Sequence, residues 1–280
     1  MKTVCISASF DDLRTPDIRF LHEASRLGAL HVLLWSDEVT QAISGSAAKF
    51  LLAERQYFVD AMRFVRQVSV VQQLAHRDEL PPADGIVPHV WAVRQAEHSA
   101  AKERFCKAGG IEYRVITDHE LAGFPALPNE IAAAPSPSPA PASGRKKVIV
   151  TGCYDWFHSG HVRFFEEVSE YGDLYVGVGN DANLELLKGK GHPHFRQEER
   201  RYVVGAVRFV HQSMISSGMG WMDSEPEIGS IKPDIYAVNE DGDKPEKREF
   251  CATHAMEYLV LKRLPKEGLT RRSSTALRGF

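Results

Sequence analysis

Cysteine is scarce in this chain of 280 residues, which contains only four. The four lie far apart, at Cys5, Cys106, Cys153 and Cys251, and none forms a CxxC pair. A disulfide framework is typical of shorter chains that are denser in cysteine. We therefore expect reduced thiols, as in a cytoplasmic protein, and neither a disulfide scaffold nor a cysteine-held zinc site.

The sequence also lacks an excess of one charge and a long apolar run. Thirty-four Lys and Arg stand against 37 Asp and Glu, for a net charge of −3, whereas nucleic-acid-binding domains usually carry a strong basic excess. No apolar stretch approaches the roughly 18 residues of a membrane span. Asp11 and Asp12 come too early for a signal-peptide core. We expect a cytoplasmic protein that binds neither nucleic acid nor membrane.

The composition is otherwise typical of a globular protein, with 43% hydrophobic and 25% charged residues. Residues 132–143 (AAAPSPSPAPAS) interrupt it, because they consist only of Ala, Pro and Ser. Such a segment has nothing to bury and forms a semi-extended spacer. The sequence predicts one domain over residues 1–124, a Pro/Ala/Ser-rich linker over 125–145 and a second domain over 146–280.

The two halves repeat one another. When residues 4–37 are shifted by 144 onto residues 148–181, ten of the 34 positions are identical. Chance would give about two at roughly 6% per position. With a shift of 145 the register continues, for example from Phe105-Cys106 to Phe250-Cys251. We infer a tandem duplication of one domain.

The second half alternates short apolar runs with amphipathic segments. Residues 147–151, 174–178, 235–238 and 258–261 are typical of buried strands, and 161–171, 197–209 and 247–255 of half-buried helices. Strands that alternate with helices form a parallel sheet with helices on both faces. We predict an α/β protein of two tandem Rossmann-like domains. Ligands of such sheets bind beyond the carboxyl ends of the strands.

The first strand of the second half runs directly into TGCYDWFHSGH, residues 151–161. Thr151 and Gly152 stand at its carboxyl end, where a glycine lets a ligand approach the backbone closely. His158 and His161 fall where the next helix begins, so both imidazoles lie beside free N–H groups and the positive end of the helix dipole. This arrangement suits a polyphosphate.

His158-Ser159-Gly160-His161 forms the HxGH motif, and this half resembles the HxGH nucleotidyltransferases. The motif is followed by Lys188-Gly189-Lys190, then by Glu199-Arg200 and Arg208-Phe209-Val210, and finally by Ser273-Ser274-Thr275. This series is similar to that of the phosphoethanolamine, phosphocholine and glycerol-3-phosphate cytidylyltransferases, and it covers about residues 147–279. The tandem layout is most similar to the ethanolamine-phosphate cytidylyltransferases, which are duplicated proteins with one decayed half.

The resemblance implies a reaction in which a phosphomonoester attacks the α-phosphorus of a nucleoside triphosphate and releases pyrophosphate. No covalent enzyme intermediate forms, so the protein positions the reactants and stabilises charge. CTP is the implied donor, and Mg²⁺ is the implied cofactor because triphosphates usually arrive as its complex. A phosphoethanolamine-, polyol-phosphate- or sugar-phosphate-like acceptor fits equally well, and the sequence does not choose among these.

The resemblance also implies a role for each motif residue. His158 and His161 would contact the triphosphate, and Lys188 would bridge the α-phosphate and the acceptor phosphate; these three are the expected catalytic residues. Ser274 and Thr275 would cap a helix that holds the β and γ phosphates. The expected nucleotide-binding residues are Thr151, Gly152, Tyr154, Asp155, Gly160, Lys190, Arg200, Asn239, Arg271, Arg272, Ser273, Ser274 and Thr275.

Some residues depart from the cytidylyltransferase pattern and leave alternatives open. SSTALR, residues 273–278, is more similar to the SSTxxR of the nicotinate-mononucleotide adenylyltransferases, which points to ATP. A nucleotide-binding regulatory protein with a decayed site is an alternative of another class, although the intact HSGH, KGK and SST elements argue against it. His192 and His194 flank a proline without a nearby cysteine, and we interpret them as loop residues rather than metal ligands.

The first half lacks the motif. Arg14-Thr15-Pro16-Asp17 replaces the residues of HSGH, and the counterpart of the Ser-Ser-Thr cluster falls on residues 128–130. An aspartate at the position of His161 would repel phosphate. We expect the first half to be inactive and to form an internal pseudo-dimer with the second, which is compatible with either a monomer or a homodimer.

Overall fold

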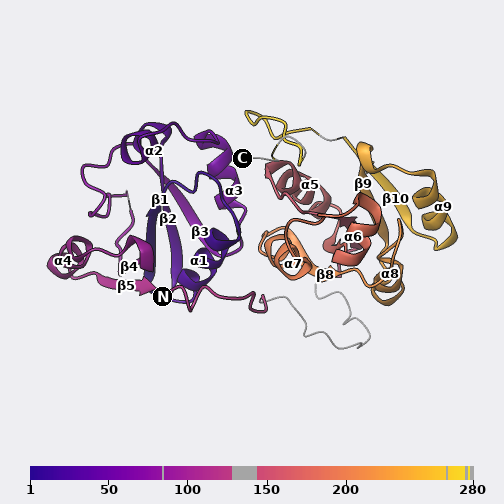
Figure 1. The fold of residues 1–280 in the computed structure, drawn as a ribbon, viewed down its shortest axis with the longest axis horizontal. Helices are drawn as coiled ribbons and strands as arrows, with labels where there is room; N and C mark the ends of the chain where they lie inside the picture. Colours follow the sequence, from indigo (N-terminus) through magenta and orange to yellow (C-terminus); the bar gives the residue numbers. More distant parts are fainter. Residues whose placement is uncertain (84, 128–143, 263, 275–276, 278–280) are drawn as a thin grey trace. The chain divides into compact units, whose positions relative to one another are not determined.

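The computed structural model describes residues 1–83, 85–127, 144–262, 264–274 and 277 (Figure 1). The chain divides into two compact units, Met1–Gly123 and Phe124–Phe280. Residues 124–127 pack on the second unit, where the Phe124 ring lies 5.6 Å from that of Tyr202 and Leu127 is buried. Among the residues described, no helix is both long and apolar enough to span a membrane.

The second unit is a parallel five-stranded sheet with helices between its strands. The strands, in the order β10-β9-β6-β7-β8 across the sheet, are β6 (Lys147–Gly152), β7 (Asp173–Val178), β8 (Val210–Ile215), β9 (Ile235–Asn239) and β10 (Glu257–Leu261). The helices are α5 (Ser159–Ser169), α6 (Asp181–Lys188), α7 (Gln197–Gly205), α8 (Glu225–Ile231) and α9 (Pro245–Thr253). This arrangement confirms the predicted α/β class.

The first unit has the same topology. Its strands, in the order β3-β2-β1-β4-β5, are β1 (Thr3–Ala8), β2 (Ala29–Trp35), β3 (Val65–Val71), β4 (Val90–Arg94) and β5 (Glu112–Ile116). Its helices are α1 (Thr15–Ser25), α2 (Asp37–Ser44), α3 (Leu52–Asp60) and α4 (Ala100–Gly109). Each of these elements begins 144 or 145 residues before its counterpart in the second unit.

Both faces of the second sheet are covered. Ile149 of β6 and Tyr236 of β9 pack with Ile228 of α8 and Cys251 of α9 on one face. Alternate residues of a strand point to opposite faces, so neighbours such as Val150 face the other side, where α5 and α7 lie against β7 and β8. Burial of both faces explains why these strands read as continuous apolar runs.

Two expectations for secondary structure differ from the structure. The expected helix over residues 197–209 ends at Gly205, and Val210 already begins β8, whose backbone pairs with β7. The sequence did not predict this strand because its middle residues, His211-Gln212-Ser213, are polar and break the apolar run. The short helices α6 and α8 were not expected either, since each spans only about two turns.

The cysteines are core residues. All four are free thiols, and three of them are fully buried. Burial raises the pKa of Cys5, Cys106 and Cys251 to about 11, so these thiols stay protonated and behave as small apolar groups. Cys106 and Cys251 fill corresponding positions in the two cores.

A buried arginine ties together the loops at the carboxyl edge of the second sheet. Arg200 of α7 donates hydrogen bonds to the backbone oxygens of Phe195, Cys153 and Gly179, at 2.8, 2.6 and 2.8 Å. It also pairs with the Asp181 carboxylate at 2.7 Å. These partners belong to the loop after β6, the loop after β7 and the loop before α7, so one guanidinium fixes all three.

The first unit contains the same interaction. Arg55 donates to the backbone oxygens of Phe50, Ser9 and Trp35 and pairs with Asp37 at 2.7 Å. Each partner lies 144 or 145 residues before its counterpart around Arg200. Both side chains are almost completely buried. The arginine is therefore part of the scaffold that the units share.

Replacing either arginine should destabilise its own unit strongly. We expect Arg200→Ala and Arg55→Ala each to lower the free energy of unfolding by about 3–5 kcal/mol, because three backbone carbonyl oxygens lose their donor at about 1–3 kcal/mol each. Chemical denaturation, followed by a probe in each unit, measures the change. Arg248→Ala is the control, since its pair with Asp243 is exposed and contributes at most about 1 kcal/mol. Equal effects of Arg200→Ala and Arg248→Ala would contradict the assignment.

Candidate active site

The site lies at the topological switch point of the second sheet. The chain runs from β6 outward to β7 and β8 and then returns to the other side of β6 as β9. β6 and β9 pair only at Val148–Ile235 and Ile149–Tyr236, so the strands diverge towards their carboxyl ends. A crevice opens at such a point in open α/β sheets, and ligands bind there.

A pocket of about 190 Å³ occupies this crevice. One water molecule takes up roughly 30 Å³ in the liquid. The pocket is several times larger and can therefore hold a phosphate group. Nine of the residues predicted from the sequence line it. They come from β6, the loop after it, the start of α5, the end of α6, the end of β9 and the C-terminal segment, and they are Thr151, Gly152, Tyr154, Asp155, Gly160, His161, Lys188, Asn239 and Ser274.

The two histidines of the motif are locked to the first turn of α5. His158 is the N-cap residue, and its Nδ1 accepts the Gly160 N–H at 3.1 Å. Its own N–H is donated to Nδ1 of His161 at 3.3 Å. The two rings stack with centroids 3.9 Å apart. Because Nδ1 of a neutral imidazole that accepts a hydrogen bond leaves the proton on Nε2, His161 can offer a donor to the pocket.

Glycine is required at two positions of this turn. A Cβ at Gly160 would lie 2.9 Å from the His158 ring, and a Cβ at Gly152 would lie 2.8 Å from the Tyr154 ring. Tyr154 itself adopts a positive φ of 54°, as its counterpart Phe10 does with 44°. The close approach of backbone and rings explains the glycines in TGCYDWFHSGH.

Two residues at or near the pocket, the buried Tyr236 and the pocket-lining Lys247, were missed by sequence reasoning. Tyr236 of β9 hydrogen-bonds Thr151 across the crevice, with 2.7 Å between the hydroxyl oxygens, and burial raises the pKa of its phenol. Lys247 of α9 lines the pocket, and burial lowers the pKa of its ammonium group. The repeat held a signal for this lysine, because Lys102 stands 145 residues earlier and its pKa is lowered by burial in the same way.

The pocket carries cationic and anionic groups. Lys188, Lys247 and the His161 imidazole can meet phosphate oxygens, while Asp155 and Asp241 supply carboxylate oxygens. Oxygen ligands are those that Mg²⁺ prefers, and it usually keeps several waters and binds substrate phosphates. The pocket residues therefore fit a triphosphate that carries a magnesium ion.

A second pocket adjoins the first and shares Gly160, Phe164 and Asn239 with it. Arg271 and Arg272, two of the predicted residues, line it. The C-terminal segment crosses α5 here, and its Lys266 pairs with Glu166 of α5 at 2.8 Å.

The remaining predicted residues lie elsewhere. Arg200 does not line either pocket, because its donors hold the surrounding loops. Lys190 is exposed, and Ser273 is half-buried. Ser274, which does line the first pocket, lies in a turn, where its hydroxyl donates to the Trp156 carbonyl at 3.3 Å. No helix begins at the described residues 273, 274 and 277, and Thr275 lies outside the described residues.

The corresponding region of the first unit holds an ion pair in place of the histidines. Asp17, the counterpart of His161, pairs at 2.5 Å with Arg94, the counterpart of Asn239. The Asp17 carboxylate also accepts the Arg14 N–H at 2.8 Å. Arg94 lies over the Phe20 ring at 4.7 Å. The cation at this crevice is thus neutralised by an internal carboxylate.

Part of the second unit is similar in sequence to known proteins. Residues 149–263 match the family model described as cytidylyltransferase-like. A bifunctional protein HldE from Campylobacter concisus is 35% identical over 103 residues, which are 35% of this chain and 21% of that protein. An FAD synthase from Ferroglobus placidus is 39% identical over 97 residues, which are 34% of this chain and 60% of that protein.

A solved structure with a similar fold is the lipopolysaccharide core biosynthesis protein from Thermoplasma volcanium, at 20% identity and a TM-score of 0.36, covering 44% of this chain and 100% of that one. The chain spans only about a fifth of the length of the HldE protein and three fifths of that of the FAD synthase. Residues 149–263 are thus similar to cytidylyltransferase-like domains, and part of the chain is similar to parts of the HldE protein and the FAD synthase.

Proposed function

We propose that the second unit transfers a nucleoside monophosphate from a triphosphate to a small phosphomonoester and releases pyrophosphate. The observation that carries the proposal is the HxGH turn. It sets the His161 imidazole and the N-terminus of α5 against a pocket at the topological switch point. We favour an enzyme over a regulatory protein with a decayed site because the HSGH, KGK and SST elements are all present in the sequence.

The reaction is an in-line displacement. An oxygen of the acceptor phosphate forms a bond to the α-phosphorus, and the bond from that phosphorus to the bridging oxygen of pyrophosphate breaks. Charge grows on the oxygens around the α-phosphorus and on the leaving group. The positive end of the α5 dipole, the Nε2–H of His161 and the ammonium groups of Lys188 and Lys247 stabilise it. A divalent ion, proposed as Mg²⁺, supplies further neutralisation of the triphosphate.

We propose ATP as the donor. The supporting observation is the relative named FAD synthase, since FAD contains an adenylyl group joined to a flavin phosphate. The SSTALR segment agrees with it. CTP is the second candidate, because Lys188-Gly189-Lys190 and the description of the matching family both point to cytidylyl transfer. We place the reaction in the cytoplasm, where the four free thiols stay reduced.

The experiment that tests the proposal is pyrophosphate release from ATP and from CTP, each with Mg²⁺. The acceptors are phosphoethanolamine, glycerol 3-phosphate, a sugar 1-phosphate and flavin mononucleotide. Turnover with ATP and one acceptor is the expected result, and turnover with CTP alone would replace the donor. If the chain binds triphosphate without releasing pyrophosphate from any pair, the regulatory alternative is favoured.

Replacing His161 should remove most of the turnover. We expect His161→Ala to lower kcat by about 10²–10³-fold, the usual effect of deleting one donor to a developing charge. Steady-state pyrophosphate release measures it, and circular dichroism checks the fold. His254→Ala, at the exposed end of α9, is the control. Near-normal activity of His161→Ala would refute the site.

A single methyl group on the turn should also impair the enzyme. In Gly160→Ala the new Cβ would meet the His158 ring at 2.9 Å, so the ring must move, and a shift of about 1 Å can cost about 10²-fold in rate. Gly229→Ala is the matched control, because no atom lies within 4 Å of a Cβ there. The kcat of both variants is compared with that of the unaltered chain. Equal activities would show that the ring position is unimportant.

We further propose that the first unit is inactive, and that it serves as the internal partner of the second. The Asp17–Arg94 pair supports the inactivity of the first unit, since a carboxylate stands in the position of His161 and neutralises the arginine there. Calorimetric titration of the full chain should give one triphosphate site. The His158→Ala/His161→Ala variant should lose triphosphate binding at that site. Two sites, or residual turnover in that variant, would contradict the proposal.

A further inference from the structure

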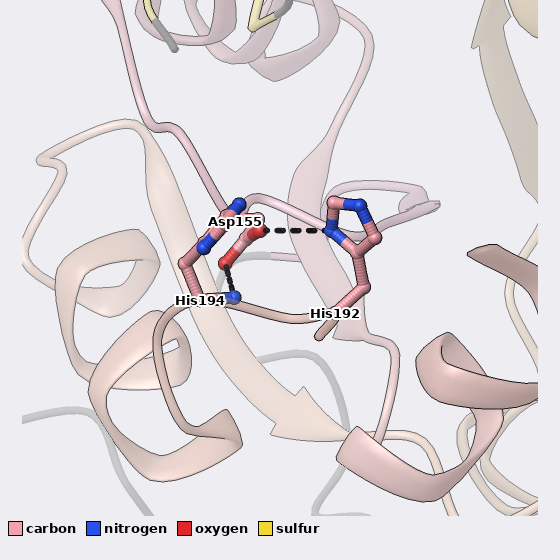
Figure 2. Close-up of side chains that lie close together, drawn as sticks. All are labelled: Asp155, His192 and His194. Carbon is pink, nitrogen blue, oxygen red and sulfur yellow. Dashed lines mark hydrogen bonds and ion pairs between the residues drawn. The ribbon is translucent and has the colours of Figure 1, made fainter. Parts of the chain in front are cut away.

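A cluster of one aspartate and two histidines lies beside the pocket. Asp155 belongs to the loop after β6, and His192 and His194 belong to the loop between α6 and α7. One possible ligand atom from each residue lies within 4.8 Å of the other two. Figure 2 shows the carboxylate between the two imidazole rings, with Nδ1 of His192 turned towards it. The three side chains thus converge on one small volume.

The two oxygens of Asp155 differ in their contacts. Oδ1 accepts the backbone N–H groups of His194 and Phe195, at 2.8 and 3.0 Å. Oδ2 faces Nδ1 of His192 across 3.9 Å, which is too long for a hydrogen bond. This Nδ1 is buried and makes no hydrogen bond to any described residue. A buried polar atom of this kind calls for a partner, and a cation between the two atoms would supply it.

The first unit shows that the loop does not need these histidines in order to fold. Asp11 anchors the corresponding loop by accepting the N–H groups of Lys49 and Phe50, at 2.9 and 3.0 Å. Ala47 and Lys49 stand where the second unit has His192 and His194. The aspartate anchor is common to both units, whereas the paired imidazoles are an addition to the second.

The ligand set selects the kind of ion. One carboxylate oxygen and two imidazole nitrogens suit a divalent transition metal and are poorly suited to Mg²⁺, which prefers oxygen. Zinc binds imidazole and carboxylate at about 2.0–2.2 Å, so tetrahedral ligand atoms lie about 3.4 Å apart. The 3.9 Å between Asp155 and His192 is close to that spacing. Small side-chain rotations would complete the site.

We propose that Asp155, His192 and His194 bind one divalent transition-metal ion, with Zn²⁺ as the best-fitting ion. Three protein ligands leave a fourth position for water. The ion joins the 189–195 loop to the loop after β6, and Lys188 stands immediately before the 189–195 loop. The proposal departs from the interpretation of the two histidines as ordinary loop residues. Metal binding is measured without nucleotide or acceptor, so its test stands apart from that of the proposed reaction.

The test is direct metal binding by the full, tag-free chain. After treatment with a chelator, the protein is titrated with Co²⁺, whose visible absorption reports coordination by nitrogen and oxygen, and Zn²⁺ is then added to displace it. We expect one ion per chain, retained in excess Mg²⁺. The His192→Ala/His194→Ala variant should bind at least about 100-fold more weakly, because it keeps one ligand of three. Absence of binding, or equal binding by this variant, would overturn the proposal.

Two controls separate loss of ligands from loss of fold. His211→Ala/His254→Ala also removes two histidines, outside the cluster, and should bind Co²⁺ as the unaltered chain does. Asp155→Asn and Asp11→Asn each weaken a loop anchor, but only the former should lose the ion. Thermal unfolding with and without Zn²⁺ gives a second readout, in which Zn²⁺ raises Tm for Asp11→Asn and leaves it unchanged for Asp155→Asn. The opposite pattern would contradict the site.

Discussion

The arrangement of the active-site loops depends on a single buried guanidinium. Arg200 satisfies three backbone oxygens and one carboxylate from three separate loops. None of these carbonyl groups lies within a helix or strand ladder, so each would be left without a partner in a dry environment if the arginine were removed. The HxGH turn and the end of α6 can face one pocket because Arg200 fixes the loops around them.

The two units illustrate how one scaffold carries two different surfaces. The sheet order, the buried arginine and the aspartate anchor are the same in both. What differs is the set of side chains at the switch point. In the second unit His161 and Asn239 leave a pocket, whereas in the first unit Asp17 and Arg94 occupy the corresponding positions and neutralise one another. The scaffold residues therefore say little about activity, and the residues at the crevice decide it.

Much of this could be predicted from the sequence, for physical reasons. Strands buried on both faces appear as apolar runs, which is why β6, β7, β9 and β10 were found within a residue or two. The carboxyl ends of parallel strands share one edge of the sheet. The sequence alone therefore predicts that Thr151, Gly152 and Asn239 lie close together. The polar centre of β8 and the short α6 and α8 carry no comparable signal.

The roles of particular polar groups were harder to predict. A sequence does not reveal whether an arginine donates to a phosphate or to carbonyls until the loops are placed, and Arg200 turned out to be surrounded by carbonyls. Tyr236 reads as an ordinary strand residue, although its hydroxyl reaches Thr151. His192 and Asp155 lie far apart along the chain, so the sequence did not predict that they lie close together in the structure.

The central claim is nucleotidyl transfer at the HxGH turn, and phosphorus NMR of the reaction mixture tests it most directly. The unaltered chain, supplied with triphosphate, Mg²⁺ and an acceptor phosphomonoester, should produce inorganic pyrophosphate together with a new diphosphate-bridged product in equal amounts. The His158→Ala/His161→Ala variant should produce neither. Formation of orthophosphate without the bridged product, or equal product from the variant, would contradict the account.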